Sequence, residues 1–175
     1  MKIVSVIGTR PQCMKLDKDL DQVIVNTGQH YSDGLNYDAF EDDLGLPKPH
    51  YELDETELVK MVGKTIKVLK KEKPDLVQVF GDTRSTLAGA LAAHEMNIPI
   101  AHVEAGMRCG RHDMPEERIR ITVDHMSKYL FVPGIQAEDN LNQEKIREHV
   151  YDVGNVMFDT FASLCPLPAP KDEDQ

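Results

Sequence analysis

The stretch HVEAGMRCGRHDMPEERIR, residues 102–120, decides the fold that we predict, because it joins a strand to a helix through a polar loop. An apolar, strand-like segment leads into it, and Pro115 opens the helix. Proline suits the first helical position, and acids in the first turn oppose the positive end of the helix dipole. The strand therefore ends at Glu104, and the helix begins beside Glu116 and Glu117.

These acids allow two interpretations. A carboxylate at the end of a strand, facing a second one at a helix N-terminus, is what general acid–base chemistry needs. Alternatively, Glu104 caps a loop, while Glu116, Arg120 and Asp124 form an i,i+4 ion stripe on a solvated helix face. Taken alone, the stretch favours the second interpretation, because charged groups are also common in structural networks.

Apolar and β-branched segments alternate with helix-like segments on both sides of this stretch. Strands are predicted over residues 2–8, 22–26, 75–80, 99–103, 129–132 and 150–153. Helices are predicted over residues 33–45, 56–72, 87–96, 136–147 and 156–163, besides the one that begins at Pro115. This alternation predicts an α/β fold, a doubly wound parallel sheet of Rossmann-like type with helices on both faces.

Three local features set the limits of this domain. Residues 14–20 leave little room for a crossover helix between the first two strands. Asp54 and Glu57 predict a capping box at the start of the 56–72 helix. One domain is expected over residues 1–163, followed by a Pro-rich, acidic tail at 164–175 that is predicted to be disordered.

The composition argues against several classes of protein. The 175 residues include 20 Lys and Arg against 30 Asp and Glu, a net charge of −10, whereas nucleic acids and anionic membranes attract positive surfaces. Cys13, Cys109 and Cys165 are odd in number and widely spaced, which predicts reduced thiols. No apolar run reaches the ~18–20 residues of a membrane span, and the N-terminus lacks a signal-peptide pattern. We therefore expect a cytoplasmic protein with no nucleic-acid or membrane partner.

Chemically active side chains follow several of the predicted strands. They are Arg10 and Lys15 after the first strand, Gln29 and His30 after the second, and Asp82 after the third. The carboxyl ends of parallel strands meet at one edge of a sheet, and that edge is where ligands bind in such folds. We therefore expect these groups to lie close to the acids of residues 102–120.

Each of these groups also has a structural interpretation. Arg10 and Lys15 are equally expected as exposed basic residues on a turn. A lone loop histidine such as His30 is more often neither a ligand nor a proton carrier. Asp82 lies where residues of its type cap a helix N-terminus. Independent caps would not usually gather at the same edge, however, and this favours the functional interpretation.

A set of motifs carries a resemblance to a known family. The motifs are GTRPQ and MK within residues 8–15, NTGQHY at 26–31, GDTRSTLAGALAA at 81–93, HVEAGMR at 102–108, MPEERIR at 114–120, DH at 124–125 and DVGNVMFD at 152–159. In order and spacing they resemble the non-hydrolysing UDP-N-acetylglucosamine 2-epimerases, from residue 1 to about residue 163. The resemblance implies the N-terminal half of a GT-B-like enzyme.

The resemblance also implies a reaction, the interconversion of UDP-N-acetylglucosamine and UDP-N-acetylmannosamine. In this family a proton leaves C2 of the sugar, and loss of UDP gives a 2-acetamidoglucal. UDP then adds back, with protonation on the opposite face. By resemblance, Asp82, Glu104 and Glu116 match the catalytic acids, without an indication of which one removes the proton. Arg10 and Lys15 match the basic residues near the diphosphate.

Further expectations follow from the same resemblance. Gln29 and His30 match a loop that binds a second, activating UDP-N-acetylglucosamine in some members. Neither a cofactor nor a metal is implied. Family members dimerise through this domain, so a homodimer is expected.

This sequence also departs from the family pattern. The family chain is roughly twice as long, and its second Rossmann-like domain supplies most of the uridine site and a further catalytic histidine. Ile119 stands where the family usually has Asn. We therefore expect either a partner chain that provides the C-terminal domain or a protein that has lost turnover. The alternative function is a non-catalytic module that binds a nucleotide sugar or docks onto a full-length epimerase. A GT-B glycosyltransferase subunit is less favoured.

Overall fold

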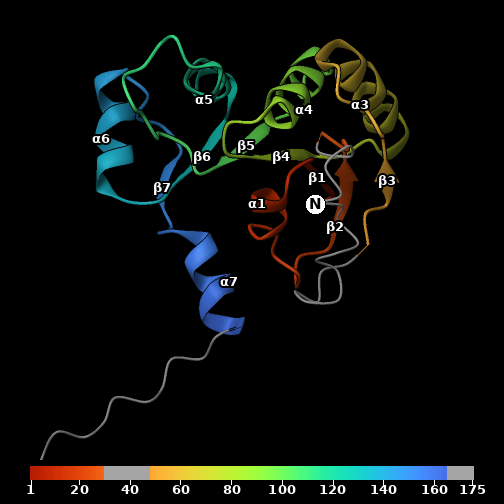
Figure 1. The fold of residues 1–175 in the computed structure, drawn as a ribbon, viewed down its shortest axis with the longest axis horizontal. Coiled ribbons are helices and arrows are strands. Elements are labelled where there is room, and N and C mark those ends of the chain that lie inside the picture. Colours follow the sequence, from red (N-terminus) through yellow and green to blue (C-terminus); the bar gives the residue numbers. More distant parts are fainter. Residues whose placement is uncertain (30–47, 165–175) are drawn as a thin grey trace, which may run out of the picture.

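A single parallel sheet of seven strands forms the centre of the molecule, in the order β3-β2-β1-β4-β5-β6-β7 (Figure 1). The computed structural model describes residues 1–29 and 48–164. Its strands are β1 (Ile3–Ile7), β2 (Gln22–Asn26), β3 (Tyr51–Glu52), β4 (Leu76–Phe80), β5 (Ile100–Val103), β6 (Tyr129–Val132) and β7 (Val150–Asp152). All neighbouring pairs run parallel, as the alternation of strands and helices predicted.

The helices cover both faces of this sheet, which confirms the predicted doubly wound architecture. They are α1 (Arg10–Cys13), α3 (Leu58–Glu72), α4 (Arg84–Glu95), α5 (Pro115–Met126), α6 (Ile135–Gln143) and α7 (Val156–Leu164). Helices α3, α4 and α5 lie side by side on one face, whereas α1 and α7 lie on the other (Figure 1).

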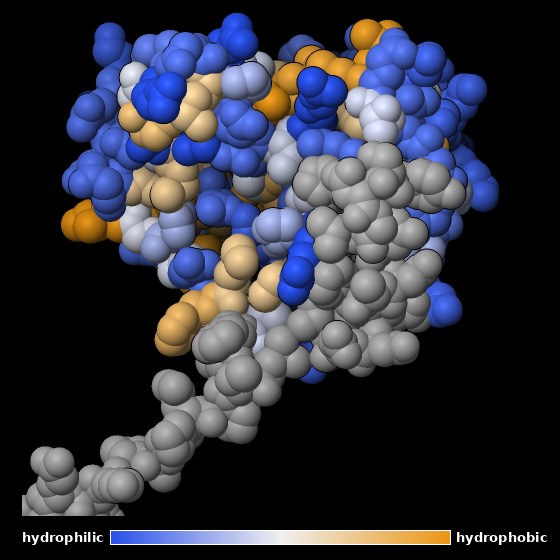
Figure 2. Space-filling view, in the orientation of Figure 1, coloured by the Kyte–Doolittle hydropathy of each residue, from blue (hydrophilic) through white to orange (hydrophobic). Residues whose placement is uncertain are grey.

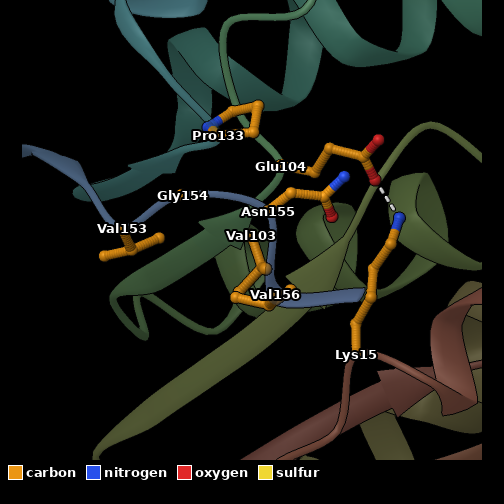
Figure 3. Close-up of a pocket in the computed structure, with 8 residues that line it drawn as sticks. All are labelled: Lys15, Val103, Glu104, Pro133, Val153, Gly154, Asn155 and Val156. Atoms are coloured by element: carbon orange, nitrogen blue, oxygen red, sulfur yellow. Dashed lines mark hydrogen bonds and ion pairs between the residues drawn. The ribbon is translucent and has the colours of Figure 1, made fainter. Parts of the chain in front are cut away.

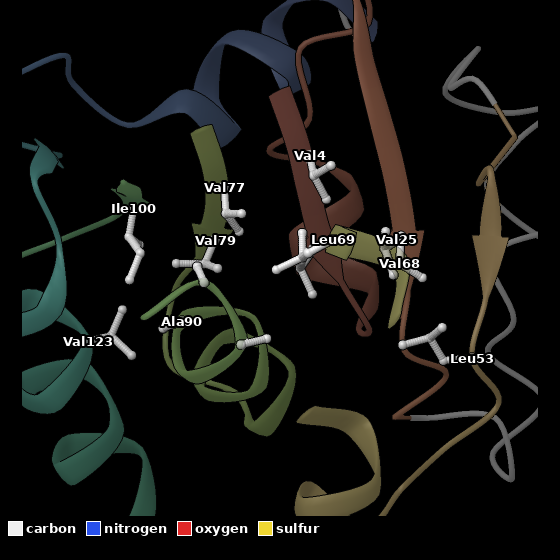
Figure 4. Close-up of a cluster of buried hydrophobic side chains, with 13 residues drawn as sticks. Val4, Val25, Leu53, Val68, Leu69, Val77, Val79, Ala90, Ile100 and Val123 are labelled. Carbon is white, nitrogen blue, oxygen red and sulfur yellow. The ribbon is translucent and has the colours of Figure 1, made fainter. Parts of the chain in front are cut away.

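The main core lies between the central strands and the first of these layers. Every residue of β1 is buried, and alternate residues of a strand point to opposite faces, so Val4 contributes to this core and Ile7 to the opposite one. Val77 and Val79 of β4 pack with Leu69 of α3 in the same cluster (Figure 4). Burial on both faces explains why the central strands read as continuous apolar runs.

The connection from β1 to β2 is short, as expected. The only helical turn in it is α1, which occupies Arg10–Cys13, earlier than the residues 14–20 considered from the sequence. Two elements, α1 and β3, were not predicted. The helix predicted over residues 33–45 and residues 165–175 of the predicted tail lie outside the described residues.

Two predicted helix starts are wrong. Asp54 has a φ of 47° and does not cap α3, whose N-cap is Glu57. The carboxylate of Glu55 instead accepts hydrogen bonds from the backbone N–H groups of Thr56 and Glu57, both at 3.1 Å. Helix α4 begins at Arg84, three residues before the prediction, because the Thr83 hydroxyl caps it by accepting from the N–H of Thr86. A glutamate two residues before an N-cap is a less familiar signal than a capping box.

Within the described residues, the two glycines inside helices, Gly63 and Gly89, make opposite predictions for stability. A Cβ at Gly89 of α4 would lie 2.8 Å from Val79 Cγ1 and 3.0 Å from Val6 Cβ, whereas one at Gly63 of α3 would have no atom within 4 Å. Gly89→Ala is therefore expected to lower the free energy of unfolding by about 1–3 kcal/mol through overpacking. Gly63→Ala is expected to raise it by about 0.5–1 kcal/mol, because alanine favours the helix.

Urea unfolding of the two variants and the parent protein measures both effects. Equal effects of the two substitutions would contradict the close packing of α4 on β1 and β4.

Candidate functional site

An open hollow lies at the carboxyl edge of the sheet, beside the ends of β5, β6 and β7 (Figure 3). Its walls come from segments that are distant in the sequence. They are Lys15 after α1, Val103 and Glu104 at the end of β5, Pro133 after β6, and Val153 to Val156 after β7. The surface over α7 is comparatively apolar (Figure 2), and Phe158 is exposed there. The lining of the hollow therefore combines apolar side chains with the charged groups of Lys15 and Glu104.

The charge in the hollow comes from an ion pair between Lys15 and Glu104 (Figure 3). The Lys15 side chain is only 7% exposed, and the Glu104 side chain is 35% exposed. Burial lowers the pKa of the Lys15 ammonium, although the negative charge of Asp82 opposes that shift. The sequence predicted both residues at this edge, and the structure brings them together.

The backbone at Glu104 has an unusual conformation. Its φ is 69°, in the left-handed region that non-glycine residues rarely adopt. Such a conformation costs free energy and clusters at functional sites, although it also occurs at helix ends, as at Lys73 after α3. It follows directly after β5 and presents the carboxylate to Lys15 (Figure 3).

Asp82 lies close to this pair. A Cβ built on Gly81, the residue before it, would be 3.5 Å from both Lys15 Nζ and Glu104 Oε2. The Asp82 carboxylate, 34% exposed, forms an ion pair with Arg120 of α5. Two of the three predicted acids and one predicted cation are thus neighbours at the sheet edge.

The two glutamates at the start of α5 differ sharply. Glu117 is buried and accepts hydrogen bonds from the backbone N–H groups of Cys109, at 3.0 and 3.1 Å, and Gly110, at 2.8 Å. Burial raises the pKa of Glu117, but these hydrogen bonds outweigh it and hold the pKa below its usual value. Glu116 is exposed, and within the described ranges no residue forms a hydrogen bond or ion pair with it. Glu117 is therefore structural, and Glu116 is free to meet a ligand.

The interpretation of α5 as carrying a solvated ion stripe is wrong. Asp124 is 1% exposed and pairs with His102 of β5 at 2.7 Å and with Arg108 at 2.7 Å. Burial raises the pKa of Asp124, but the charges of His102 and Arg108 hold it below its usual value. Arg120 meets Asp82 rather than its helical neighbour Glu116. The polar side of α5 therefore faces the loops of the sheet edge.

A buried amide also joins the loops after β1 and β4. Gln12 accepts hydrogen bonds from Gly8 N–H at 2.9 Å and Thr9 N–H at 3.2 Å, and it donates to the Phe80 carbonyl at 2.7 Å. It also contacts the hydroxyl of Thr86 at 2.9 Å. Gln12 thus fixes the position of the Asp82 turn relative to α1.

The remaining predicted residues have different surroundings. Arg10 is the exposed first residue of α1, near the end of β1. The side-chain oxygen of Gln29 accepts from the N–H of Ser85 at 3.0 Å and from its hydroxyl at 2.9 Å, which ties the loop after β2 to α4. His30 lies outside the described residues.

The sequence interpretation assigned no functional role to several residues that shape the edge. They are Gln12, His102, Glu117, Arg120, Asp124 and Asn155. A signal existed for some of them, since a histidine inside the apolar strand IAHV and an aspartate next to the buried Val123 must both have partners. The partners themselves come from different elements, and their pairing is set only by the tertiary fold.

Three further findings concern cysteines, metals and membranes. Cys13 and Cys109 are free thiols, as predicted, whereas Cys165 lies outside the described residues. Burial raises the pKa of Cys13 to about 12, which makes it a poor nucleophile. In residues 1–29 and 48–164, no cluster of three or more His, Cys, Asp or Glu side chains is arranged to hold a metal ion. None of the helices in the same part of the chain is long and apolar enough to cross a membrane.

Comparisons with known proteins agree with one another. The sequence model of the UDP-N-acetylglucosamine 2-epimerase family matches residues 12–172. A UDP-N-acetylglucosamine 2-epimerase homolog of Methanococcus maripaludis is 42% identical over 180 residues, which cover 95% of this chain and 50% of that protein. The UDP-2,3-diacetamido-2,3-dideoxy-D-glucuronate 2-epimerase of Pseudomonas aeruginosa is also 42% identical, over 178 residues that cover 91% of this chain and 50% of that protein.

Solved structures of epimerases also match this chain. The crystal structure of the Methanocaldococcus jannaschii UDP-GlcNAc 2-epimerase in complex with UDP-GlcNAc and UDP is similar with a TM-score of 0.87 and 41% sequence identity. The matched region covers 93% of this chain and 49% of that chain. The chain therefore spans about half the length of the relatives that it matches.

The contrast between Glu116 and Glu117 makes a testable prediction. Glu117→Gln is expected to lower the free energy of unfolding by about 1–3 kcal/mol at neutral pH, because the amide loses the charge that accepts the N–H groups of Cys109 and Gly110. The neighbouring Glu116→Gln leaves stability unchanged.

The pH dependence of this effect has a definite sign. Because the folded-state pKa of Glu117 is lowered, its contribution is present above the unfolded-state pKa and is lost as the pH falls through the folded-state value. The difference in urea midpoint between Glu117→Gln and the parent protein should therefore shrink in acid. A difference that is independent of pH would contradict the proposed role of the charge.

Proposed function

This chain belongs to the UDP-N-acetylglucosamine 2-epimerase family, and on that premise we propose that its sheet edge carries the proton-transfer groups of a UDP-N-acetylglucosamine 2-epimerase. The reaction interconverts UDP-N-acetylglucosamine and UDP-N-acetylmannosamine. One observation supports this proposal above the others: the Lys15–Glu104 pair lies in the hollow with Asp82 beside it.

The chemistry at C2 needs a base on one face of the sugar and an acid on the other. Proton removal from C2 and cleavage of the C1–O bond release UDP and leave a 2-acetamidoglucal, and the reverse addition returns a proton from the opposite face. Asp82 and Glu104 follow β4 and β5, and Glu116 lies in the first turn of α5, so the three carboxylates come from separate segments that can approach a bound sugar from different sides. We assign the two proton transfers to this set of carboxylates.

The cations of the edge have a complementary task. The departing diphosphate gains negative charge at the bond that breaks, and a nearby ammonium or guanidinium stabilises that charge. Lys15 and Arg10 are the residues that we assign to this role. Glu104 holds Lys15 inside the hollow, so the cation is already in place when the nucleotide sugar binds.

The substrate assignment within the family rests on the relatives. The Methanocaldococcus jannaschii structure contains UDP-GlcNAc and UDP, and the Pseudomonas aeruginosa relative with the same level of identity acts on UDP-2,3-diacetamido-2,3-dideoxy-D-glucuronate. Both names describe 2-acetamido sugars attached to UDP, which share the groups around C2. We propose UDP-N-acetylglucosamine as the substrate and the diacetamido uronate as the competitor to test against it.

The active unit that we propose contains a second nucleotide-binding half. The hollow is open, and Phe158 of α7, the helix whose first residue Val156 lines the hollow, is 61% exposed, which supports a surface that another domain covers. That half is provided either by the same polypeptide or by a partner chain, within a cytoplasmic homodimer. Gln29 and His30 are proposed to contact a second UDP-N-acetylglucosamine that activates the enzyme.

The proposal predicts C2 exchange in a fusion protein, which we define as this chain joined to the half of the Methanocaldococcus jannaschii epimerase that it does not match. In D2O, proton NMR should show the C2 proton of UDP-N-acetylglucosamine disappearing and UDP-N-acetylmannosamine forming. Asp82→Asn should slow both by about 10²–10⁴-fold, because an amide cannot transfer the proton. The matched control Asp139→Asn, at an exposed position of α6, should leave the rates unchanged.

Binding separates a failed assembly from a failed proposal. If the fusion protein binds UDP by calorimetry as tightly as the Methanocaldococcus enzyme does, yet leaves the C2 proton in place, the catalytic proposal is wrong. Such a result would favour a non-catalytic module that binds nucleotide sugars or docks onto an epimerase. If the C2 proton of the UDP-linked diacetamido uronate exchanges faster than that of UDP-N-acetylglucosamine, the uronate is the substrate, and the proposed proton transfer at C2 still holds.

A further inference from the structure

A histidine and an aspartate that cannot touch the substrate lie directly beneath the candidate catalytic acids. His102 is 0% exposed and Asp124 is 1% exposed. His102 Nδ1 lies 2.7 Å from Asp124 Oδ1, and His102 Nε2 lies 2.8 Å from the carbonyl oxygen of Gly81. The imidazole therefore bridges a carboxylate of α5 and the backbone of the turn after β4.

The hydrogen bonds define which atoms of this pair donate and which accept. A carbonyl oxygen only accepts, so His102 Nε2 must donate to Gly81. A neutral ring would then direct the lone pair of Nδ1 at the carboxylate of Asp124, whereas a ring with both protons donates at both ends. Asp124 is ionised in this arrangement, because its second oxygen also accepts from Gly106 N–H at 3.1 Å and from Arg108 at 2.7 Å. Both nitrogens of the buried ring are therefore held, Nδ1 by the Asp124 carboxylate and Nε2 by the Gly81 carbonyl.

The pair connects both loops that carry candidate acids. Gly81 immediately precedes Asp82, so the His102 contact sets where that turn lies. Gly106 follows Glu104 by two residues, so the Asp124 contact sets where the other loop lies. A single carboxylate on α5 thus fixes the Glu104 loop directly and the Asp82 turn through the imidazole.

Arg108, the second charged partner of Asp124, is also held in place. Arg108, which contacts Asp124, donates to both carboxylate oxygens of Glu144, at 2.7 Å from Nε and 2.8 Å from Nη2. Glu144 is the C-cap residue of α6. The charged groups that face Asp124 are therefore His102 and Arg108, and each of them is held by a second contact.

We propose that the buried His102–Asp124 pair is a positioning device that fixes the distance between the Asp82 and Glu104 carboxylates. This inference rests on the proposed function, since it assigns the two loops a common catalytic task. The pair acts through the backbone and through its neighbours, and neither side chain takes part in proton transfer. Its loss should leave nucleotide-sugar binding largely intact while slowing the chemical step, because displacement of a catalytic group by about 1 Å can cost about 100-fold in rate.

Two substitutions release one loop each. Asp124→Asn keeps an oxygen for His102 but places an NH2 group against the Gly106 N–H, which frees the Glu104 loop. His102→Asn keeps a donor for Asp124 but is too short to reach the Gly81 carbonyl, which frees the Asp82 turn. In the fusion protein each is expected to lower kcat by about 10–100-fold with a KM for UDP-N-acetylglucosamine within about 3-fold of the parent value.

A core substitution separates positioning from loss of stability. Leu69→Ala removes a fully buried side chain from α3, a helix that contributes no residue to the hollow. It should destabilise the protein and leave kcat unchanged when assayed at a temperature where the variants are folded. If Asp124→Asn and His102→Asn behave like Leu69→Ala, the pair is merely part of the core and the inference is overturned.

Amide hydrogen exchange in this chain tests the inference by a measurement that does not depend on enzyme activity. Asp124→Asn should speed hydrogen exchange at the N–H of Gly106, and His102→Asn should shift the backbone resonances of Asp82. If the fusion protein is inactive but the exchange rate at Gly106 and the resonances of Asp82 change as expected, the proposed function is wrong and the positioning role is still supported. Unmoved loops in an active enzyme would defeat the positioning role alone.

The unmodified protein provides a last check that does not depend on the folding of any variant. Nitrogen-15 NMR of the His102 ring should detect a proton on Nε2, the nitrogen that donates to the Gly81 carbonyl. A ring without a proton on Nε2 would contradict the bridge between Asp124 and Gly81.

Discussion

All the strands run in the same direction, and this constraint brings the polar loops to one edge of the sheet. Lys15, Asp82 and Glu104 are far apart in the sequence, yet each follows the carboxyl end of a central strand or the short helix after it. No long-range motif is needed to gather them. The same constraint directs the first turn of α5, with Glu116, toward that edge.

Beneath the exposed acids lies a layer of buried polar groups. Gln12, Glu117 and Asp124 are each almost fully buried, and each is hydrogen-bonded to the backbone of a loop at the edge. A buried polar group without a partner would be costly, so each of these contacts allows few alternative loop conformations. Rigid loops of this kind hold reacting groups in place more accurately than loops stabilised only by their own turns. The half-exposed acids above them remain available to a ligand.

The sequence predicted the architecture well, because hydrophobic periodicity and turn residues are local signals. The alternation of strands and helices predicted the parallel sheet, and the shared edge of parallel strands predicted that Lys15, Asp82 and Glu104 lie together. It did not separate Glu116 from Glu117, since adjacent residues at a helix start differ only in the direction they face, which is set by packing. The pairing of Asp124 with His102 instead of a helical neighbour likewise depends on how α5 sits on β5. For Gln12, the many hydrogen bonds come from two loops that meet only in the fold.

A crystal structure of the fusion protein with UDP-N-acetylglucosamine bound would test the central claim most directly. We expect C2 of the sugar to lie among the carboxylates of Asp82, Glu104 and Glu116, with the diphosphate against Arg10 and Lys15. A nucleotide sugar bound elsewhere on the domain, or one whose C2 lies beyond the reach of all three carboxylates, would contradict it.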